Sequence, residues 1–267
     1  MKNLLTIAGS DCSGGAGIQA DLKTFAAHRA YGMSVIVSVV AENTSRVIAI
    51  QDIDIGIIED QLEAVFEDIR VDGVKVGMLS NAGTMKAVAG KLRKYGPPNP
   101  VIDPVMVAKG GCALMREDAL DTLKSEIIPL AFVLTPNIPE AEAITGLKIT
   151  GIGEMKKAAE LISKMGAKNV LIKGGHLAGD AVDILYDGEH FNAYPNERVQ
   201  TKNTHGTGCT LSSSIAANLA NGLEITDAVS AAKTYITTAI RHALPIGKGH
   251  GPTNHFYQLY KNGGLNL

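Results

Sequence analysis

Short apolar segments alternate along most of the chain with longer amphipathic segments. Runs rich in Val, Ile and Leu predict strands at residues 4–8, 34–40, 74–76, 101–102, 132–135 and 170–173. Apolar positions at helical spacing predict helices at residues 18–28, 58–70, 84–95, 117–128 and 154–165. Strands that are apolar throughout and separated by helices indicate a mostly parallel sheet covered by helices on both faces.

The last third of the chain departs from this alternation. Two short segments, residues 182–186 and 190–194, flank Asp187-Gly188 and predict an antiparallel hairpin at one edge of the sheet. Residues 211–221, 225–243 and 255–260 predict helices. The sequence contains no internal repeat, low-complexity tract or linker, so residues 1–267 are expected to form one doubly wound α/β domain.

Composition narrows the expected partners. The chain has 267 residues, of which 45% are hydrophobic and 19% charged, as in ordinary globular proteins. Its net charge of −2 gives no electrostatic reason to expect nucleic acid or an anionic membrane as a partner. No apolar stretch is long enough to span a bilayer, and the N-terminal segment does not resemble a signal peptide. The three cysteines form neither a disulfide framework nor a zinc pattern, and we expect a cytoplasmic protein.

Polar residues and glycines follow nearly every predicted strand. In doubly wound sheets, ligands bind beyond the carboxyl ends of the strands, so these residues are expected to meet at one rim. They are Gly9-Ser10-Asp11, Glu42-Asn43, Gly77-Met78, Asp103, residues 137–140 and Lys173-Gly174-Gly175-His176. The sequence therefore predicts a single binding site at this rim.

The turn at residues 203–210 is the most informative segment of the sequence. Gly206 and Gly208 allow close approach of the backbone to a ligand, and the amides of the following helix start favour an anion. Cys209 lies at the same helix start, where positive potential lowers the pKa of a thiol. This pattern predicts an anion site beside a base or nucleophile. The alternative is a plain tight turn followed by a cysteine buried as a small hydrophobe.

A second glycine-rich segment spans residues 9–17. No Lys-Ser or Lys-Thr follows Gly14 at the required place, which excludes a Walker P-loop. The segment from Gly15 to Ala20 matches the relaxed dinucleotide pattern G-x-G-x-x-A, with Glu42 ending the next strand. Its glycines begin six residues beyond the strand, whereas a dinucleotide fold needs them immediately. An NAD-dependent oxidoreductase is therefore a weak alternative.

Four further candidates have two interpretations each. Asn137 and Glu140 form either a helix capping box or a Mg²⁺ site. Lys173 is either a point charge for a phosphate or a solvated lysine, and Asp103 is either a functional carboxylate or a loop cap. His205 and His176 are expected to be surface or hydrogen-bonded histidines.

Taken together, the motifs resemble a known family. In order, they are LTIAGSDCSGGAGIQADLKTF, VVAENT, KVGML, VIDPVMVAKGG, LTPNIPEAE, IKGGH and KNTHGTGCTLSS. They are similar to those of the hydroxymethylpyrimidine/phosphomethylpyrimidine kinases of thiamin biosynthesis, in the ribokinase-like superfamily, over essentially the whole chain. The resemblance implies a three-layer αβα fold and ATP-dependent phosphorylation of 4-amino-5-hydroxymethyl-2-methylpyrimidine and then of its monophosphate. It also implies Mg²⁺ and a homodimer.

The resemblance assigns roles by position. Cys209 takes the place of the catalytic base, and the amides of Gly206 to Cys209, with Thr207 and Gly208 between them, surround the transferred phosphoryl group. The implied pyrimidine pocket is lined by Gly9, Asp21, Val40, Glu42 and Met78. The implied ATP and Mg²⁺ residues are Asn137, Glu140, Lys173 and Lys233, with Asp103 a further candidate metal ligand.

Two positions depart from the family pattern. Position 42 is often Gln in this family, and Glu42 matches its donor only if the carboxyl or the pyrimidine ring carries a proton. Related pyridoxal kinases carry a second cysteine in the segment that follows Asp103, where this chain has Ala108. Cys112 does not restore that pattern, and Cys12 and Cys112 are expected to be structural or incidental. A pyrimidine kinase is favoured over a pyridoxal kinase, an oxidoreductase and a non-catalytic ligand-binding relative.

Overall fold

One nine-stranded sheet forms the centre of the molecule, with strand order β3-β2-β1-β4-β5-β6-β7-β8-β9. The computed structural model describes residues 1–108, 110–175 and 181–263. The strands are β1 Lys2–Gly9, β2 Ala30–Glu42, β3 Val47–Asp52, β4 Gly73–Val76, β5 Val101–Ile102, β6 Val133–Leu134, β7 Asn169–Ile172, β8 Ala181–Tyr186 and β9 Phe191–Asn196. Pairing is parallel from β2 through β7 and antiparallel at both edges. The predicted mostly parallel sheet and the edge hairpin β8–β9 are confirmed.

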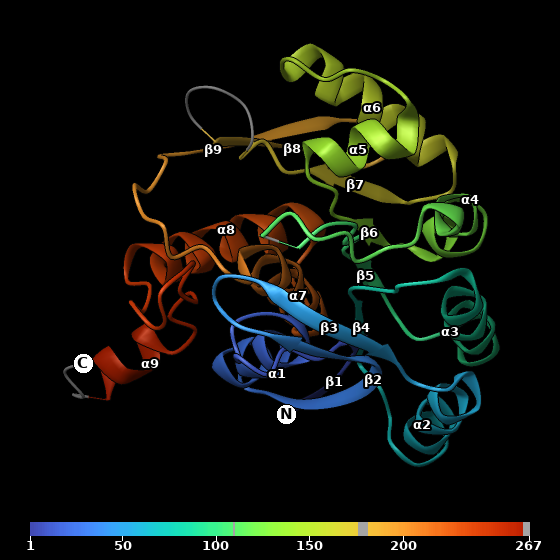
Figure 1. Ribbon diagram of the computed structural model, residues 1–267. Helices are drawn as coiled ribbons and strands as arrows, with labels where there is room; N and C mark the ends of the chain where they lie inside the picture. The colour runs from blue at the N-terminus through green and yellow to red at the C-terminus, as the bar shows by residue number, and fades with distance from the viewer. Residues whose placement is uncertain (109, 176–180, 264–267) are drawn as a thin grey trace.

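Helices cover both faces of this sheet (Figure 1). The main ones are α1 Gly17–Ala27, α2 Ile55–Asp68, α3 Ala82–Tyr95, α5 Ile138–Thr145, α6 Ile152–Lys164, α7 Thr207–Ala220, α8 Ile225–Arg241 and α9 Tyr257–Asn262. Helices α1, α7 and α8 pack on one face, and α2, α3, α5 and α6 pack on the other. The predicted three-layer αβα architecture is confirmed.

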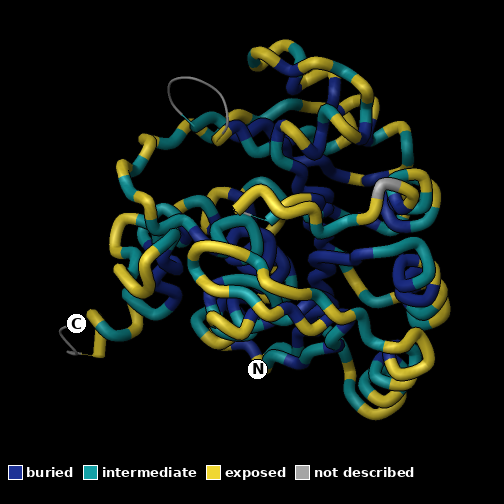
Figure 2. Tube along the Cα trace, viewed as in Figure 1, coloured by how far each residue is buried: buried dark blue, intermediate teal, exposed yellow. Residues whose placement is uncertain are grey.

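Neighbouring residues of the strands supply two separate hydrophobic cores. Leu5 and Ile7 of β1 pack under α2 and α3, whereas Leu4 packs with α7 and α8 on the opposite face. The short strand β6 divides in the same way, because Leu134 joins the first core and Val133 the second. Side chains of a strand alternate between faces, so strands covered on both sides must be apolar at every position. Figure 2 shows the resulting buried centre beneath more exposed outer helices.

Two segments differ from the sequence-based expectation. Strand β3 was not predicted, although residues 47–50 are all apolar; among the described residues it pairs with β2 at the sheet edge, and its side chains are exposed or half-buried. Residues 117–128 form no regular α-helix but a 3-10 turn, one α turn and the π-helical segment Leu123–Ile127, followed by a 3-10 turn. Pro129 has no N–H to donate to the carbonyl four residues earlier, which disfavours continuation of regular helix.

The order of the strands places a crevice beside β1. The chain moves from β1 to β2 on one side and later to β4 on the other, so connections leave the carboxyl ends in opposite directions there. The loop after β1 and the turn before α7 are packed together at this edge, since a Cβ on Gly206 would overlap the carbonyl oxygen of Gly15. Among the described residues, no helix is long and apolar enough to cross a membrane.

Candidate active site

A cavity of about 790 Å³ opens at the carboxyl edge of the sheet. Most of the residues predicted to form the site line it: Gly9, Val40, Glu42, Met78, Asp103, Asn137, Glu140, Lys173, Gly206, Thr207, Gly208, Cys209 and Lys233. Its size is typical of cavities that hold small molecules and cofactors. Asp21, which was expected to line the pyrimidine pocket, is not among its lining residues.

The turn before α7 begins the helix without a side-chain cap. Gly206 is the N-cap residue at φ +74°, a left-handed conformation that favours glycine. No cap bond from a side chain occupies the first amides of α7, and Thr207, Gly208 and Cys209 all line the cavity. The Thr207 amide donates to the Thr204 carbonyl at 3.4 Å, so the amides of Gly208 and Cys209 are the candidates for binding an anion at this helix start.

The first glycine-rich loop packs against this turn. Gly17 lies at φ +53°, where an added Cβ would overlap the carbonyl oxygen of Gly9. A Cβ on Gly15 would overlap the ring of His205. Gly17 lets this loop fold back on its own start, and Gly15 lets it pack on the turn before α7, which gives the G-x-G-x-x-A match a structural cause and argues against a dinucleotide turn.

Lys173 and Asp103 form an ion pair beside the same turn. The Lys173 ammonium lies 2.7 Å from Asp103 Oδ1, and a Cβ on Gly208 would be 3.5 Å from Lys173 Nζ. Burial opposes the charge of Lys173, but the carboxylates of Asp103 and Glu140 raise its pKa above the ordinary value. A fixed positive charge therefore lies next to the amides of α7. Thr135 also donates to Asp103 Oδ1, at 3.1 Å.

Asn137 and Glu140 form the capping box that one interpretation of the sequence predicted. The Glu140 amide donates to Asn137 Oδ1 at 2.9 Å, and the Asn137 amide donates to Glu140 Oε2 at 2.8 Å. Glu140 is almost fully buried, and burial raises its pKa to about 7 against the opposing charge of Lys173. These two residues thus combine a helix cap with lining of the cavity, and a backbone hydrogen bond from Met106 also acts on the Glu140 carboxylate.

Cys209 has a raised pKa, contrary to the expectation from its helix start. Burial of the thiol raises its pKa to about 11; the charge of Lys75 opposes this, and the charges of Asp21 and Asp103 add to it. Burial therefore raises the pKa of the thiol by more than the positive potential of the helix terminus lowers it. In the unliganded protein the thiol keeps its proton at neutral pH.

A buried ion pair lies beneath Cys209 and was missed from the sequence. Lys75 of β4 and Asp21 of α1 are both fully buried, and Lys75 Nζ donates to Asp21 Oδ2 at 2.8 Å. Thr6 and Ser213 donate to the same carboxylate at 2.6 Å each, so Asp21 is bound by three side chains. Lys75 also lines the cavity. The signal in the sequence was a lysine inside the otherwise apolar strand Gly73–Val76.

Gly9, Val40 and Met78 form an apolar corner of the cavity. A Cβ on Gly9 would lie 2.6 Å from Met78 Cε and 3.7 Å from the Val40 side chain, so a larger residue would have to displace the end of Met78. Glu42 lies two residues beyond Val40 at the end of β2. Its backbone is fixed by Cys12, whose thiol donates to the Glu42 carbonyl at 3.0 Å. This contact agrees with the structural role that was one expectation for Cys12.

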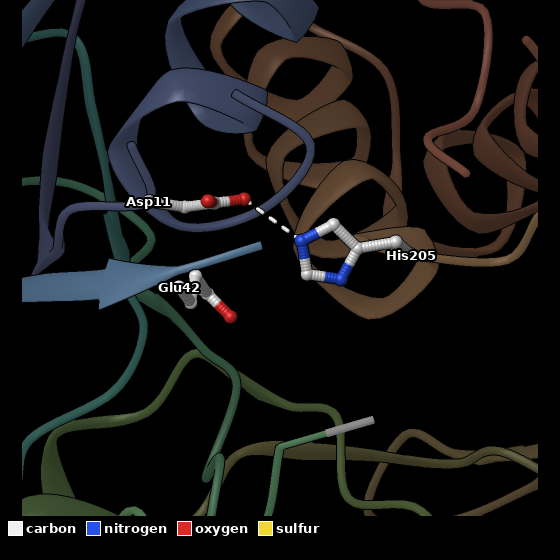
Figure 3. Close-up of side chains that lie close together, drawn as sticks. All are labelled: Asp11, Glu42 and His205. Atoms are coloured by element: carbon white, nitrogen blue, oxygen red, sulfur yellow. Dashed lines mark hydrogen bonds and ion pairs between the residues drawn. The ribbon is translucent and has the colours of Figure 1, made fainter. Parts of the chain in front are cut away.

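Asp11, Glu42 and His205 meet beside this corner (Figure 3). Their ligand atoms all lie within 4.8 Å of one another, and His205 Nε2 is 2.8 Å from Asp11 Oδ2. Burial, followed by the charge of Asp11, raises the pKa of Glu42 to about 7, while His205 opposes the shift. The sequence analysis placed Asp11 in the rim segment after β1 but assigned it no role in the site.

Lys233 lies at another part of the cavity wall. Its ammonium pairs with Asp183 at 2.7 Å, and Asp183 also accepts from the Gly174 amide at 2.9 Å. Both charged residues line the cavity, as expected for Lys233. His176 lies outside the described residues. Cys112 is exposed and absent from the cavity lining, whereas Ala108 is part of it.

Comparison with known proteins decides the family. A profile of the phosphomethylpyrimidine kinase family matches residues 11–254. The chain belongs to this family. It is 50% identical over 262 residues to the hydroxymethylpyrimidine/phosphomethylpyrimidine kinase of Rhizobium meliloti, covering 97% of this chain and 98% of that one. It is 52% identical over 254 residues to a bifunctional thiamine biosynthesis protein of Geobacter sulfurreducens, covering 95% of this chain but only 52% of that longer protein.

Solved structures of two kinds of vitamin kinase share the fold. The phosphomethylpyrimidine kinase of Clostridium difficile is 50% identical and superposes with a TM-score of 0.82, over 90% of this chain and all of that one. An ADP complex of Bacillus subtilis pyridoxal kinase is 40% identical with a TM-score of 0.91, over 97% of this chain and 99% of that one. Fold similarity therefore does not separate pyrimidine from pyridoxal as substrate.

Proposed function

We infer that this protein transfers a phosphoryl group from ATP to 4-amino-5-hydroxymethyl-2-methylpyrimidine and then to the resulting monophosphate. The turn at residues 205–209 carries this inference, because it joins the two halves of one cavity. His205 at its start contacts Asp11 near Glu42, and Gly208 lies beside Lys173 and Asp103. A pyrimidine against Glu42 and a triphosphate against Lys173 would thus meet at Cys209. We propose that residues 1–267 form one kinase domain, because the described strands all belong to a single sheet.

The chemistry assigned to the turn is charge neutralisation and proton transfer. Phosphoryl transfer has a loose transition state, so its catalysis depends on alignment and on stabilising charge at the transferred oxygens. The amides from Gly206 to Cys209 and the ammonium of Lys173 supply this stabilisation. Cys209 accepts the proton of the substrate hydroxyl, which requires hydrogen-bonding distance in the complex. Only the thiolate can accept this proton, so the Cys209 thiol must first lose its own proton to solvent. With a thiol pKa of about 11 the thiolate is scarce at neutral pH, and the positive charges of Lys75 and Lys173 favour it.

The residues present fit a magnesium ion with nucleotide. Asp103 and Glu140 provide two carboxylates near Lys173 in the cavity wall, and Mg²⁺ needs few protein ligands when phosphates and waters complete its shell. We assign Asp103 and Glu140 to Mg²⁺, and Asn137, Lys173, Thr207 and Lys233 to ATP. When bound, Mg²⁺ neutralises phosphate charge. Lys173 does so independently of the metal, and its contact with Asp103 fixes its position.

The substrate pocket is assigned to Gly9, Val40, Glu42 and Met78. Asp21 acts from behind it, because its carboxylate orients Lys75 and contacts the helix that carries Cys209 through Ser213. Glu42 provides the polar group that recognises the amino edge of the ring. Apolar neighbours exclude water from this contact, which strengthens it.

A coupled assay of ADP release tests the function directly. We expect the purified protein to turn over the pyrimidine alcohol and its monophosphate with Mg-ATP, and Cys209→Ala to lose the first activity by roughly 10²-fold or more. Preparation of Cys209→Ala in parallel excludes a contaminating kinase. Absence of turnover with both pyrimidines would refute the proposal.

Pyridoxal kinase activity remains the second candidate, because the TM-score of the Bacillus subtilis pyridoxal kinase is 0.91. Ala108 in the cavity wall argues against it, since the second cysteine of the related pyridoxal kinases is missing there. Measurement of kcat/KM for pyridoxal beside the pyrimidine alcohol in the same assay decides between them. A higher value for pyridoxal would reverse the assignment.

We further propose a cytoplasmic homodimer. Within the part of the chain that the structure describes, no strand pairs with the outer edge of β3, and the β2–β3 hairpin exposes Val39 and Ile48 at 50% and 64% of their surfaces. Exposed apolar side chains on a sheet edge are typical of association surfaces. Light scattering after size-exclusion chromatography should give twice the monomer mass of 28.0 kDa, and a monomer would contradict this proposal.

A further inference from the structure

Three ionisable side chains from distant parts of the sequence converge at the pyrimidine end of the cavity. Asp11 lies in the loop after β1, Glu42 ends β2, and His205 precedes α7 (Figure 3). Asp11 and His205 are almost fully buried, at 1% and 8% exposure. Only Glu42 and His205 of the three line the cavity, so Asp11 acts on a ligand through its neighbours.

Asp11 is fixed as an ionised group. Its two carboxylate oxygens accept from the amides of Ser13, Gly15 and Ala16 at 2.7–2.9 Å and from His205 Nε2 at 2.8 Å. Burial alone would raise its pKa, but these hydrogen bonds and the charge of His205 lower it well below the ordinary value. The carboxylate therefore provides a permanent negative charge next to Glu42.

His205 provides the opposing charge. Burial acts to lower the pKa of His205, but its hydrogen bond to Asp11 and the charges of Asp11 and Glu42 raise it overall. An imidazolium paired with Asp11 is electrically neutral as a unit. A proton on Glu42 then leaves the whole three-residue group neutral, which is the least costly state in a poorly hydrated cavity.

We propose that Asp11 and His205 are positioning residues that together set the protonation of Glu42, Asp11 favouring the proton and His205 limiting it, so that the protonated carboxyl offers both a donor and an acceptor to an aminopyrimidine edge. This inference rests on the proposed function. The O–H of the Glu42 side-chain carboxyl donates to the ring nitrogen beside the amino group. The other oxygen of the same carboxyl accepts from the amino group. A protonated carboxyl thereby replaces the amide of the glutamine that is common at this position in the family.

The two positioning residues act in opposite directions. The negative charge of Asp11 favours the proton on Glu42, and the positive charge of His205 disfavours it, which leaves the pKa near 7. Near Glu42, the Cys12 thiol donates to the Glu42 backbone carbonyl, and the Asn43 amide donates to the Arg46 carbonyl. The His250 amide donates to the Thr44 carbonyl, so neither Arg46 nor His250 contacts the Glu42 carboxyl through these bonds. Lys75 lines the same cavity, but its charge is compensated by Asp21.

A metal ion explains the cluster less well than a proton does. The three residues offer ligand atoms of the kinds that bind metals, at compatible separations. However, the oxygens of Asp11 already accept four N–H groups, and His205 Nε2 is one of these donors. A metal would have to displace the hydrogen bonds that hold the loop after β1.

Calorimetric titration with the pyrimidine alcohol from pH 5.5 to 9 tests the proposal. In the wild type, Kd should be constant at low pH and rise about tenfold per pH unit above pH 7, since only the protonated pair binds. In Glu42→Gln this rise should disappear, because the amide donates at every pH. In His205→Gln, whose amide still donates to Asp11 but is neutral, the midpoint should move upward by about half a pH unit or more.

Each outcome supports or overturns the inference. A wild-type Kd that is independent of pH would overturn it, as would a His205→Gln midpoint that is unchanged or lower. Stoichiometric Zn²⁺ or Mn²⁺ binding without nucleotide, abolished by His205→Gln, would also overturn it in favour of a metal site. Failure of the proposed function is distinguishable, because the wild type would then not phosphorylate the pyrimidine alcohol at any pH.

Discussion

The buried pair of Lys75 and Asp21 leads to the strongest prediction about stability. Both side chains are completely excluded from solvent, and the pair is the only fully buried one among the ion pairs of the described residues. Lys75→Met removes the ammonium and leaves the Asp21 carboxylate with two hydroxyl donors and no counter-charge. Breaking such a pair from one side destabilises a protein by about 3–5 kcal/mol.

The effect is large enough to measure in two ways. For a chain of this size, about 3–5 kcal/mol corresponds to a fall in Tm of roughly 6–20 °C. Urea denaturation should show a lower midpoint with an unchanged m value, which keeps the comparison within a two-state description. Lys94→Met is the matched control, because Lys94 pairs with Glu63 at 3.0 Å on the surface, with 53% of its side chain exposed. It should change stability by less than about 1 kcal/mol.

A double-mutant cycle separates the pair from the packing of its members. The neutral combination of Lys75→Met with Asp21→Asn should be more stable than the sum of the two single effects predicts, by about 1–3 kcal/mol. Strict additivity would refute the reasoning, since it would mean that the two charges do not stabilise each other. So would a loss in Lys75→Met no larger than that in Lys94→Met.

Three further predictions concern the turn before α7. Cys209→Ala should impair phosphorylation of the pyrimidine alcohol more than that of its monophosphate, whose acceptor oxygen is already ionised, whereas Lys173→Ala should impair both. Equal losses in Cys209→Ala would contradict its role as a base. With the thiol pKa at about 11, the rate of Cys209 alkylation by iodoacetamide should rise about tenfold per pH unit from pH 7 to 10, measured in a Cys12→Ser, Cys112→Ser background. A plateau below pH 9 would contradict the raised pKa. Gly206→Ala should lower Tm and weaken the binding of Mg-ATP measured by calorimetry, because Gly206 has φ +74° and the added methyl would overlap Gly15 of the neighbouring loop. An unchanged Tm and Kd would show that the two loops do not pack tightly.

Much of the fold was determined by local pattern. The central strands are apolar at successive positions because they are covered on both faces, and this left a clear signal at Leu4, Leu5 and Ile7. Strand β3 has an apolar run at residues 47–50 that was overlooked, and its exposed and half-buried side chains reflect its place at the sheet edge, which the run does not specify. The rim residues were also predictable in part, since the carboxyl ends of parallel strands must meet at one edge.

The sequence by itself determined which residues could reach the rim and that Gly206 and Gly208 precede a helix start. Only the tertiary structure decided the chemical state of the groups there. Asp11 and His205 are 194 residues apart, and Lys75 and Asp21 are 54 apart, yet each pair is in direct contact. The helix start at Cys209 suggested a lowered pKa, but burial raised it. A pKa depends on the water excluded and the charges placed by distant segments, and a linear pattern of residues does not specify either.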